Sequence, residues 1–330
     1  MKWSRWFFAL VQLLVLVAMF ASCKARADDD EVKGEKVYAT GRVVPADLEE
    51  RKVRSAERNA GFQFPRATAK RLDWRELGVV PPIVSQRDCG SCWDFAGCGT
   101  CTMSAIRTGH GKADGSFRLS EQYVLDCGRN GGCSGDDHST VFDMALKDGL
   151  PLAAEYGEYT ARPGHCKPVT FKQKIKGWGY CEPGARGPAS VQSIKDAMAA
   201  KGPISVAIAA DSRFMNIRPG TVFSGSSRAI NHEVILVGWD DDDGAWILRN
   251  SWGTGWADSG YCKIKYGANE VGTDAAWVDT VAVDPPPPPA PVPPVPPAPM
   301  PFWLSLLINV VIALLSGLTG HQIGSRRIVR

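Results

Sequence analysis

The segment from Gln86 to Arg107 constrains the fold of this chain more than any other stretch. It reads Q-R-D-C-G-S-C-W and then D-F-A-G-C-G-T-C-T-M-S-A-I-R, so a turn at Gly90 and Ser91 leads into a largely apolar helical run. We therefore expect a helix from Cys92 to about Arg107, with Ser91 as its N-cap. Free N–H groups and the helix dipole at such an N-terminus lower the pKa of a cysteine and favour its thiolate.

A cysteine at a helix start is weak evidence of catalysis, since most unpaired cysteines are small buried hydrophobes. The run from Cys89 to Trp93 matches the C-G-[SA]-C-[WY] pattern of papain and cathepsins, in which His and Asn follow about 130–150 residues downstream. His232 follows Cys92 after 140 positions, in N-H-E-V-I-L-V-G-W, and Asn250 lies 18 further on, in N-S-W-G-T-G-W. From Leu72 to Val283 the chain therefore resembles the papain-like cysteine peptidases.

This resemblance implies an α+β, papain-like two-lobe fold. A helical lobe would meet a β-barrel-like lobe at a cleft, with the cysteine on the helical wall and the histidine on the β wall. The periodicity agrees, because helical patterns precede strand patterns along the chain. Further helices are expected at 120–127, 138–147 and 190–201, and strands at 203–209, 233–239, 245–250 and 261–266.

The resemblance also implies the chemistry of peptide hydrolysis. Cys92 would be the nucleophile, and His232 would stabilise its thiolate and then protonate the leaving amine. Asn250 would orient the imidazole, and Trp252 would shield the bond between them from water. Gln86, six residues before Cys92, would share the oxyanion hole with the Cys92 backbone N–H.

A second set of residues is expected to contact substrate, again by resemblance. It comprises Gly135, Asp136, Asp137, His138, Asn231, Glu233 and Trp252. Asp137, His138 and Glu233 resemble walls of the pocket for the substrate residue two before the scissile bond. An acidic lining there would favour Arg or Lys over the bulky apolar residue that most of the family accepts.

Two residues near the cysteine depart from the family pattern. Arg87 stands directly after the glutamine, where glycine is usual, and Asp94 stands two residues after Cys92, where alanine is usual. The charge of Asp94 so near the thiol is expected to raise the thiol pKa.

Ten cysteines point to an oxidising compartment. The resemblance implies the pairs Cys89–Cys133 and Cys127–Cys166. Cys98 and Cys101 lie three apart on one predicted helix, which is awkward geometry for a mutual bridge. We expect a third bridge between Cys181 and Cys262, and no metal or cofactor.

The N-terminal residues 1–27 read as a secretory signal peptide: Lys2 and Arg5 precede an apolar run, and A-R-A follows it. An uncleaved membrane anchor and lipidation at Cys23 are the alternatives. Residues 28–70 are charged, with one short amphipathic helix, and form either a pro-segment or a flexible linker before the expected peptidase domain at 71–283.

After the domain the composition changes abruptly. Residues 284–301 form a stiff proline-rich spacer, and 302–320 form a 19-residue apolar stretch that is long enough to span a bilayer. The basic tail 321–330 would stay cytoplasmic, which places the domain on the extracytoplasmic side. A cleaved sorting signal and a buried soluble helix remain the alternatives to a retained transmembrane helix.

The sequence thus predicts a membrane-anchored cysteine endopeptidase that acts as a monomer on peptides or proteins. The net charge of +3 gives no indication of a nucleic-acid partner. Two other functions remain open: a peptide ligase or acyl transferase that resolves the same thioester with an amine, and a binding module on an inactive scaffold.

Overall fold

The computed structural model describes residues 35–128, 132–170 and 172–280. The predicted signal peptide, spacer, transmembrane helix and basic tail lie outside these residues. Among the described residues, no helix combines the length and apolar character needed to cross a membrane.

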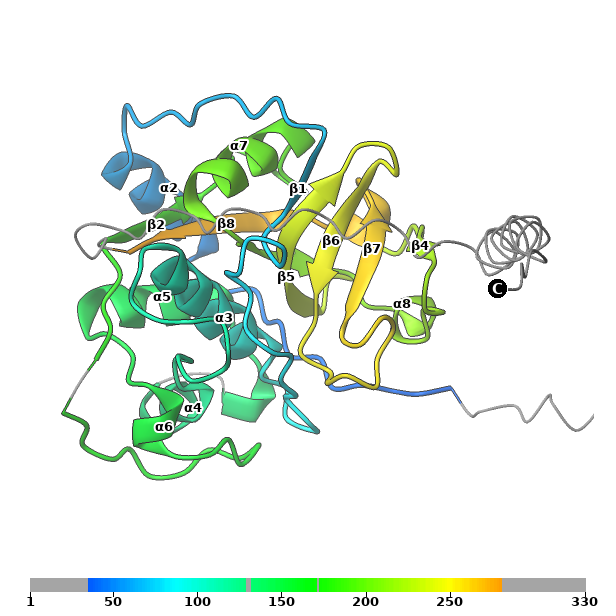
Figure 1. The fold of residues 1–330 in the computed structure, drawn as a ribbon. Coiled ribbons are helices and arrows are strands. Elements are labelled where there is room, and N and C mark those ends of the chain that lie inside the picture. Colours follow the sequence, from blue (N-terminus) through cyan, green and yellow to red (C-terminus); the bar gives the residue numbers. More distant parts are fainter. Residues whose placement is uncertain (1–34, 129–131, 171, 281–330) are drawn as a thin grey trace, which may run out of the picture. The chain divides into compact units, whose positions relative to one another are not determined.

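Short helices and one mixed sheet alternate along the described chain (Figure 1). The helices are α2 (Leu48–Arg58), α3 (Cys92–Arg107), α4 (Glu121–Cys127), α5 (His138–Lys147), α6 (Ala153–Tyr156), α7 (Val191–Lys201) and α8 (Ser212–Met215), with 3-10 turns η1 (Gly132–Ser134) and η2 (Ala268–Glu270). The strands are β1 (Arg71–Asp73), β2 (Gly177–Tyr180), β3 (Ile204–Ile208), β4 (Val222–Phe223), β5 (His232–Asp240), β6 (Ala245–Arg249), β7 (Tyr261–Lys265) and β8 (Thr273–Asp279).

The strands pair in the order β2-β8-β3-β5-β6-β7-β4, and β1 pairs with β5. Every pairing is antiparallel except that of β4 with β7. The hairpin of β5 and β6 sets Trp239 opposite Trp246. Strand β5 carries Trp239 near one end and His232 and Glu233 at the other, so β5 is the element that brings His232 and Glu233 to the site.

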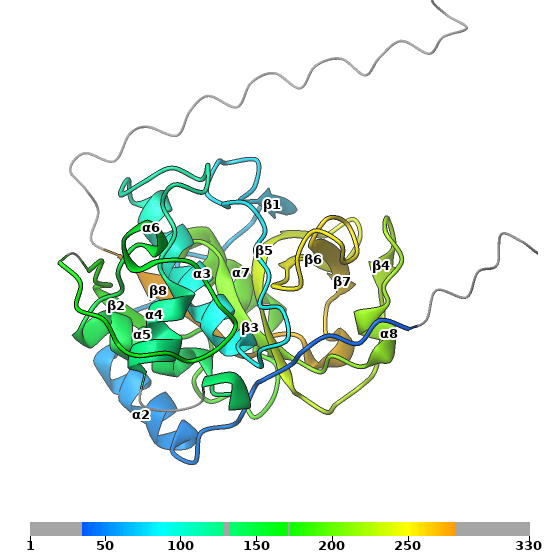
Figure 2. The same cartoon turned by 90° about the horizontal axis from the view of Figure 1, so that it is seen from below.

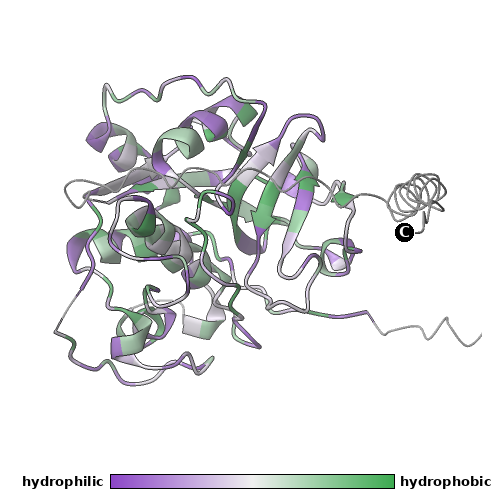
Figure 3. Cartoon of the chain, viewed as in Figure 1, coloured by the Kyte–Doolittle hydropathy of each residue, from purple (hydrophilic) through white to green (hydrophobic). Residues whose placement is uncertain are grey.

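Two hydrophobic cores account for the two predicted lobes. One gathers Trp93 and Phe95 of α3 with Phe142 of α5, and the other gathers Trp239 and Trp246 with side chains of β3 and α7. Figure 3 shows apolar residues concentrated in strands β5 and β6. The expected α+β fold, with a helical and a β-rich lobe, is therefore confirmed.

A third apolar cluster joins α3 to β5 and β6. Ala96 and Met103 of α3 pack with Ile235 and Val237 of β5. Gly99 faces Ile235, and a Cβ at Gly99 would lie 2.6 Å from the Ile235 Cδ1 atom. The helix that carries Cys92 and the strand that carries His232 are therefore packed directly against each other.

The predicted helices begin and end close to where their sequence signals place them. Ser120, Asp137 and Ser190 each cap a helix by accepting a hydrogen bond from a backbone N–H of its first turn. Ser91 precedes α3 as expected, but its side chain does not cap the helix. Its hydroxyl bonds the Tyr159 hydroxyl at 2.7 Å instead, so that part of the prediction is wrong.

The strands β1, β2, β4 and β8 were not anticipated from the sequence. Strand β8 matters most for the site, because it lies between β2 and β3 and carries Asp274 at its start.

Both disulfides that the resemblance implies are present, Cys89–Cys133 and Cys127–Cys166. The expected Cys181–Cys262 bridge is wrong, because both thiols are free. Cys181 directly follows β2 and Cys262 lies in β7, and four strands separate β2 from β7 in the sheet order. A disulfide requires the two Cα atoms to lie within about 7 Å of each other.

The charged N-terminal segment packs against the domain. Helix α2 lies beside β2, with Leu48 buried in the helical core. The amide of Asn59, just after α2, donates to the Trp178 carbonyl of β2 at 3.2 Å. The segment is therefore docked through both apolar and polar contacts in this structure.

Candidate active site

Cys92 is the first residue of α3, and its side chain is completely buried. Backbone groups of Glu233, Gly41 and Trp93 lie against its thiol. Burial, followed by the charge of Glu233, raises the pKa of Cys92 to about 12. The expected lowering of this pKa by the helix terminus is therefore outweighed by loss of solvent, and the thiol is protonated in this state.

His232 and Asn250 form the predicted hydrogen bond, with 2.9 Å between Nε2 of the histidine and Oδ1 of the asparagine. The same Oδ1 accepts from the Ser251 N–H at 2.8 Å, which identifies it as the oxygen. Since an amide oxygen can only accept, Nε2 carries the proton and Nδ1 of the neutral ring is bare. Among the described residues Nδ1 has no hydrogen-bond partner, and burial lowers the pKa of His232 to about 4.

Trp252 covers this pair. Its ring stacks on the imidazole of His232 with centroids 4.4 Å apart and planes at 21°. Only 6% of Trp252 is exposed, so its position suits the predicted shielding of the His232–Asn250 bond from water. Tyr38 stacks on the same indole at 4.6 Å.

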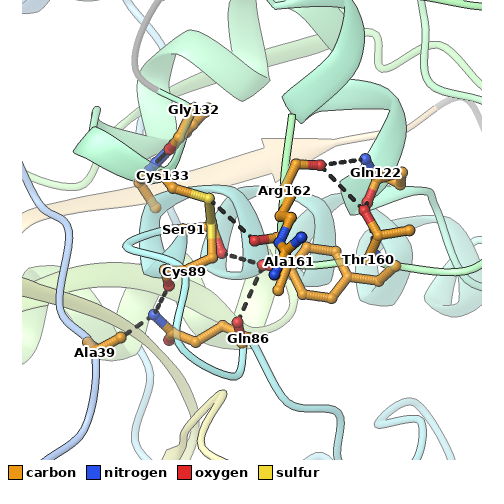
Figure 4. The surroundings of a disulfide bond; sticks show 12 residues. Ala39, Gln86, Cys89, Ser91, Gln122, Gly132, Cys133, Thr160, Ala161 and Arg162 are labelled. Carbon is orange, nitrogen blue, oxygen red and sulfur yellow. Dashed lines mark hydrogen bonds between the residues drawn. A yellow bond between two sulfur atoms is a disulfide. The ribbon is translucent and has the colours of Figure 1, made fainter. Parts of the chain in front are cut away.

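Gln86 is fixed on both sides, as Figure 4 shows for part of its surroundings. Its Oε1 accepts from the Ser251 hydroxyl at 2.6 Å, and its backbone carbonyl accepts from the Tyr159 hydroxyl at 3.1 Å. Its Nε2 donates to the backbone carbonyls of Cys89 at 2.9 Å and Ala39 at 3.1 Å. The amide predicted to bind an oxyanion is thus occupied by a carbonyl of the N-terminal segment.

Residues 36–44, here named the cleft strap, run from α8 across to α2 (Figure 2). At one end the Lys36 N–H donates to the Asn216 side chain at 2.9 Å. In the middle the Ala39 carbonyl accepts from both Gln86 and the Trp252 indole N–H, the latter at 3.0 Å. The strap therefore touches the predicted oxyanion donor and the residue that covers the histidine.

Backbone hydrogen bonds tie the strap to both lobes. On the helical side, the Val43 N–H donates to the Asp136 carbonyl at 2.9 Å and the Asp136 N–H donates to the Gly41 carbonyl at 3.0 Å, a parallel bridge. On the β side, the Arg42 N–H donates to the Asn231 carbonyl at 3.1 Å. Two of the predicted substrate-contacting residues thus present backbone groups to an extended peptide.

Two glycines permit the close approach of the strap. A Cβ at Gly41 would lie 1.8 Å from the Gly90 carbonyl oxygen, and a Cβ at Gly135 would lie 2.5 Å from the Gly41 carbonyl oxygen. Gly135 also has a φ of 105°, which disfavours any side chain. The predicted contact role of Gly135 is therefore one of steric clearance.

The Arg42 side chain enters a pocket lined by carboxylates. Its Nη2 lies 3.4 Å from the Asp137 Oδ2 and also pairs with Asp274, and its Nε lies 3.4 Å from the Glu233 Oε1. These four side chains are at most 4% exposed. Asp274 was missed in the sequence, because neither β8 nor its position beside Glu233 can be read from local spacing.

His138 completes the pocket wall. Its Nδ1 lies 3.0 Å from the Glu233 Oε2. Burial lowers the pKa of His138, but the charges of Glu233 and Asp137 outweigh burial and raise it to about 9. Burial raises the pKa of Glu233 to about 7 against the opposing effect of His138. His138 therefore adds positive charge to this pocket at neutral pH.

The remaining predicted residues have other roles. The Asp136 carboxylate accepts from the Thr140 hydroxyl and from the Asp137 N–H, while its backbone groups bond the strap. The Asn231 side chain pairs with both backbone groups of Ala210. Arg87 has a φ of 53°, which explains physically why glycine suits this position.

The expected influence of Asp94 on the thiol is wrong. The Asp94 side chain turns into the protein, where it accepts from the Cys98 thiol at 3.2 Å. Burial raises the pKa of Asp94 well above its ordinary value, which favours its uncharged form. The carboxylate that acts on Cys92 is Glu233.

Asp137, His138 and Glu233 offer ligand atoms within 4.8 Å of one another, a spacing that suits a metal ion. The Arg42 guanidinium lies against two of the three, so a cation of the chain itself already supplies the positive charge there.

A model of the papain family of cysteine proteases matches residues 68–280. This chain belongs to that family. "Cysteine proteinase 2" of Zea mays is 33% identical over 210 residues, which cover 61% of this chain and 56% of the maize protein. "Cathepsin L-like proteinase" of Fasciola hepatica is 34% identical over 213 residues, covering 60% of this chain and 61% of its own. The match to the "Oryzain beta chain" of Oryza sativa subsp. japonica covers 47% of that protein. The present chain therefore spans about half the length of the curated relatives that it matches.

Solved structures agree with this membership. A Carica candamarcensis cysteine protease in complex with E-64 has a TM-score of 0.56 and 29% identity, and the match covers 64% of this papain-family chain and 99% of that one. The ragweed pollen allergen Amb a 11, in its proform, has a TM-score of 0.59 at 22% identity, with 74% of this chain and 75% of that one covered, and supports the fold alone.

Proposed function

We propose that this chain is a papain-type cysteine endopeptidase in precursor form. The observation that carries the proposal is the oriented His232, whose Nε2 is bonded to Asn250 and whose Nδ1 is bare, in a site with a helix-terminal cysteine. The family to which the chain belongs supports the same activity, since its model is described as cysteine protease.

The residues then have the following roles. The Cys92 proton passes to Nδ1 of His232, and the thiolate attacks the carbonyl carbon of the scissile peptide bond. Gln86 Nε2 and the Cys92 N–H donate to the developing oxyanion. His232 returns the proton to the leaving amine as the C–N bond breaks, and water then hydrolyses the thioester. Asn250 keeps the imidazole in the required tautomer throughout.

We infer that the cleft strap keeps this machinery inactive. Its Gly41 backbone lies against the buried Cys92 thiol, its Ala39 carbonyl occupies the Gln86 amide, and its Arg42 side chain lies in the acidic pocket. A protonated thiol and a neutral imidazole are the wrong protonation states for attack. Removal of residues around 36–44 would expose the site to water and restore the thiolate–imidazolium pair.

The test uses the full chain, purified in detergent, before and after limited proteolysis of its N-terminal segment. We expect E-64 labelling and cleavage of fluorogenic peptide amides only after processing, and neither in Cys92→Ser. Circular dichroism checks that Cys92→Ser has the same fold as the wild-type chain. The endopeptidase proposal is wrong if the processed wild-type chain neither binds E-64 nor cleaves any peptide.

Secretion and membrane anchoring are a separate part of this proposal. The two disulfides fit an extracytoplasmic location. The apolar runs before residue 28 and at 302–320 support export and a retained anchor. We expect the full chain to stay in the membrane fraction after extraction with alkaline carbonate, as an integral membrane protein does. Deletion of residues 302–320 should move the protein to the soluble fraction. Carbonate release of the full chain would exclude the anchor.

A further inference from the structure

The acidic pocket beside the site is built for a cation. Asp137 and Glu233 are completely buried, and Asp274 is 4% exposed at its side chain. Three carboxylates this close would repel one another and lose hydration, so burial without a positive partner would be costly. Arg42 of the strap provides that partner in this structure.

The contacts of Arg42 fit a guanidinium in particular. The planar guanidinium approaches the three carboxylates through two nitrogen atoms, Nη2 toward Asp137 and Asp274 and Nε toward Glu233. A lysine ammonium is a compact point charge and cannot reach the three acids from separate nitrogen atoms. The buried Oδ2 of Asp137 and Oε1 of Glu233 have no hydrogen-bond partner among the described residues, and both face Arg42.

The N-terminal segment supplies a second cation. Lys52 of α2 pairs with the other oxygen of Asp274, Oδ1, at 2.9 Å. The three acids are therefore matched by Arg42, Lys52 and the protonated His138. When the segment leaves, the three acids lose both of its cations, and among the described residues His138 is the cation that stays beside Glu233.

We propose that the processed enzyme uses this pocket to bind an arginine of the substrate, two residues before the scissile bond, with Asp274 as its main partner. The inference rests on the proposed endopeptidase function. The position in the substrate follows the expectation, from the family resemblance, that Asp137, His138 and Glu233 line this pocket, and the choice of arginine follows from the contacts of Arg42. An apolar side chain would leave the carboxylates buried without a partner.

Asp274 is a suitable specificity residue for a second reason. It has a φ of 49°, a conformation that Asp and Asn tolerate better than other side chains. Asp274→Asn therefore removes the charge while keeping both the shape and the backbone conformation. Glu233→Gln is the second variant, and Asp240→Asn, at the opposite end of β5 from Glu233, is the matched control.

The experiment measures kcat/KM of the enzyme obtained by processing the full chain. The substrates are peptide amides that differ only at the residue two before the scissile bond, which is Arg, Lys, citrulline or Leu. Active sites are counted with E-64. Since citrulline keeps the shape of arginine without its charge, we expect arginine to exceed citrulline by about 10-fold or more. In Asp274→Asn the arginine/citrulline ratio of kcat/KM should fall at least fivefold, mainly through a higher KM for the arginine substrate. The kcat/KM for the Leu substrate should not change in this variant. The control Asp240→Asn should keep the wild-type arginine/citrulline ratio.

Faster cleavage of Leu than Arg by the wild-type enzyme would overturn the inference and leave the endopeptidase function intact. An Arg/citrulline ratio that is unchanged in both Asp274→Asn and Glu233→Gln would also overturn it. If Asp274→Asn does not fold, as judged by E-64 titration, the wild-type ranking and Glu233→Gln decide the question. Absence of both E-64 labelling and cleavage would instead count against the proposed function itself.

Discussion

The side-chain amide of Gln86 donates a hydrogen bond of 3.1 Å to the backbone carbonyl of Ala39. The two residues are 47 positions apart, and their contact joins the predicted oxyanion donor to the strap that covers it. The same carbonyl is bonded by Trp252. Inhibition and catalysis would therefore compete for one set of donors, and this leads to predictions about both.

Gly41→Ala should release the strap. The new Cβ would lie 1.8 Å from the Gly90 carbonyl oxygen, so the strap could not keep its course. An overpacking cost of about 1–3 kcal/mol corresponds to about 5- to 150-fold faster E-64 labelling of the unprocessed full chain. Val37→Ala, at a strap position that is 86% exposed, is the control and should label as slowly as wild type. Equal rates for Gly41→Ala and wild type would show that the strap does not limit access.

Arg42→Gln should destabilise the precursor by about 3 kcal/mol, because it leaves three buried carboxylates without their main cation. Chemical unfolding of the full chain in a Cys92→Ser background measures this loss. Arg54→Gln is the matched control: Arg54 is half exposed and, within the described part of the chain, pairs with the exposed acids Asp47 and Glu50, so the expected loss is below about 1 kcal/mol. Similar losses in the two variants would contradict the importance of the pocket.

Stability should fall as pH rises from 7 to 8.5. His138 has a folded pKa raised to about 9, above its ordinary 6.5, so its contribution is complete below 6.5 and is lost as pH rises through 9. The pKa of Glu233 is raised from 4.5 to about 7, so its contribution to stability also falls as pH rises from 4.5 to 7. In that range the lowered pKa of His232 has the opposite effect on stability. One proton corresponds to a slope of about 1.4 kcal/mol per pH unit at most.

The free energy of unfolding of the Cys92→Ser chain, measured at several pH values, checks this slope. His138→Gln should flatten it between pH 7 and 8.5, whereas His165→Gln, at an exposed position, should leave it unchanged. A slope that persists in His138→Gln would mean that another group titrates.

Asn250→Ala should slow the processed enzyme by about 10- to 100-fold in kcat, the value of one buried hydrogen bond that orients the imidazole. The measurement is kcat per E-64-titrated site, so that a loss of folded protein is not counted as a loss of rate. The pH profile of kcat should also shift, because the hydrogen bond with Asn250 no longer raises the pKa of His232. An unchanged kcat would show that Trp252 stacking alone orients His232.

The elements that sequence reasoning placed correctly depend on local signals. Helix α3 begins at Cys92 because a turn precedes it, and α4 and α7 begin after serines that cap them. The His232–Asn250 pair followed from motif order, and the structure brings the two residues together across β5 and β6.

The parts that were missed depend on distant strands. Asp274 reaches the pocket only because β8 inserts between β2 and β3, which no spacing reveals. The same sheet order separates Cys181 from Cys262. The charged segment could be a linker or a pro-segment on composition alone, because its docking relies on backbone bonds and on Arg42, whose partners come from other elements.

Gly99 carries no reactive group, yet its lack of a side chain governs alignment at the site. The gap between helix α3 and strand β5 is narrow there because only a hydrogen atom faces Ile235. Because α3 begins at Cys92 and β5 begins at His232, the packing of this apolar cluster helps to set how these two residues lie relative to each other. The tolerance of this buried layer to substitution would therefore limit how far its sequence can vary before the predicted nucleophile and its predicted base lose their alignment.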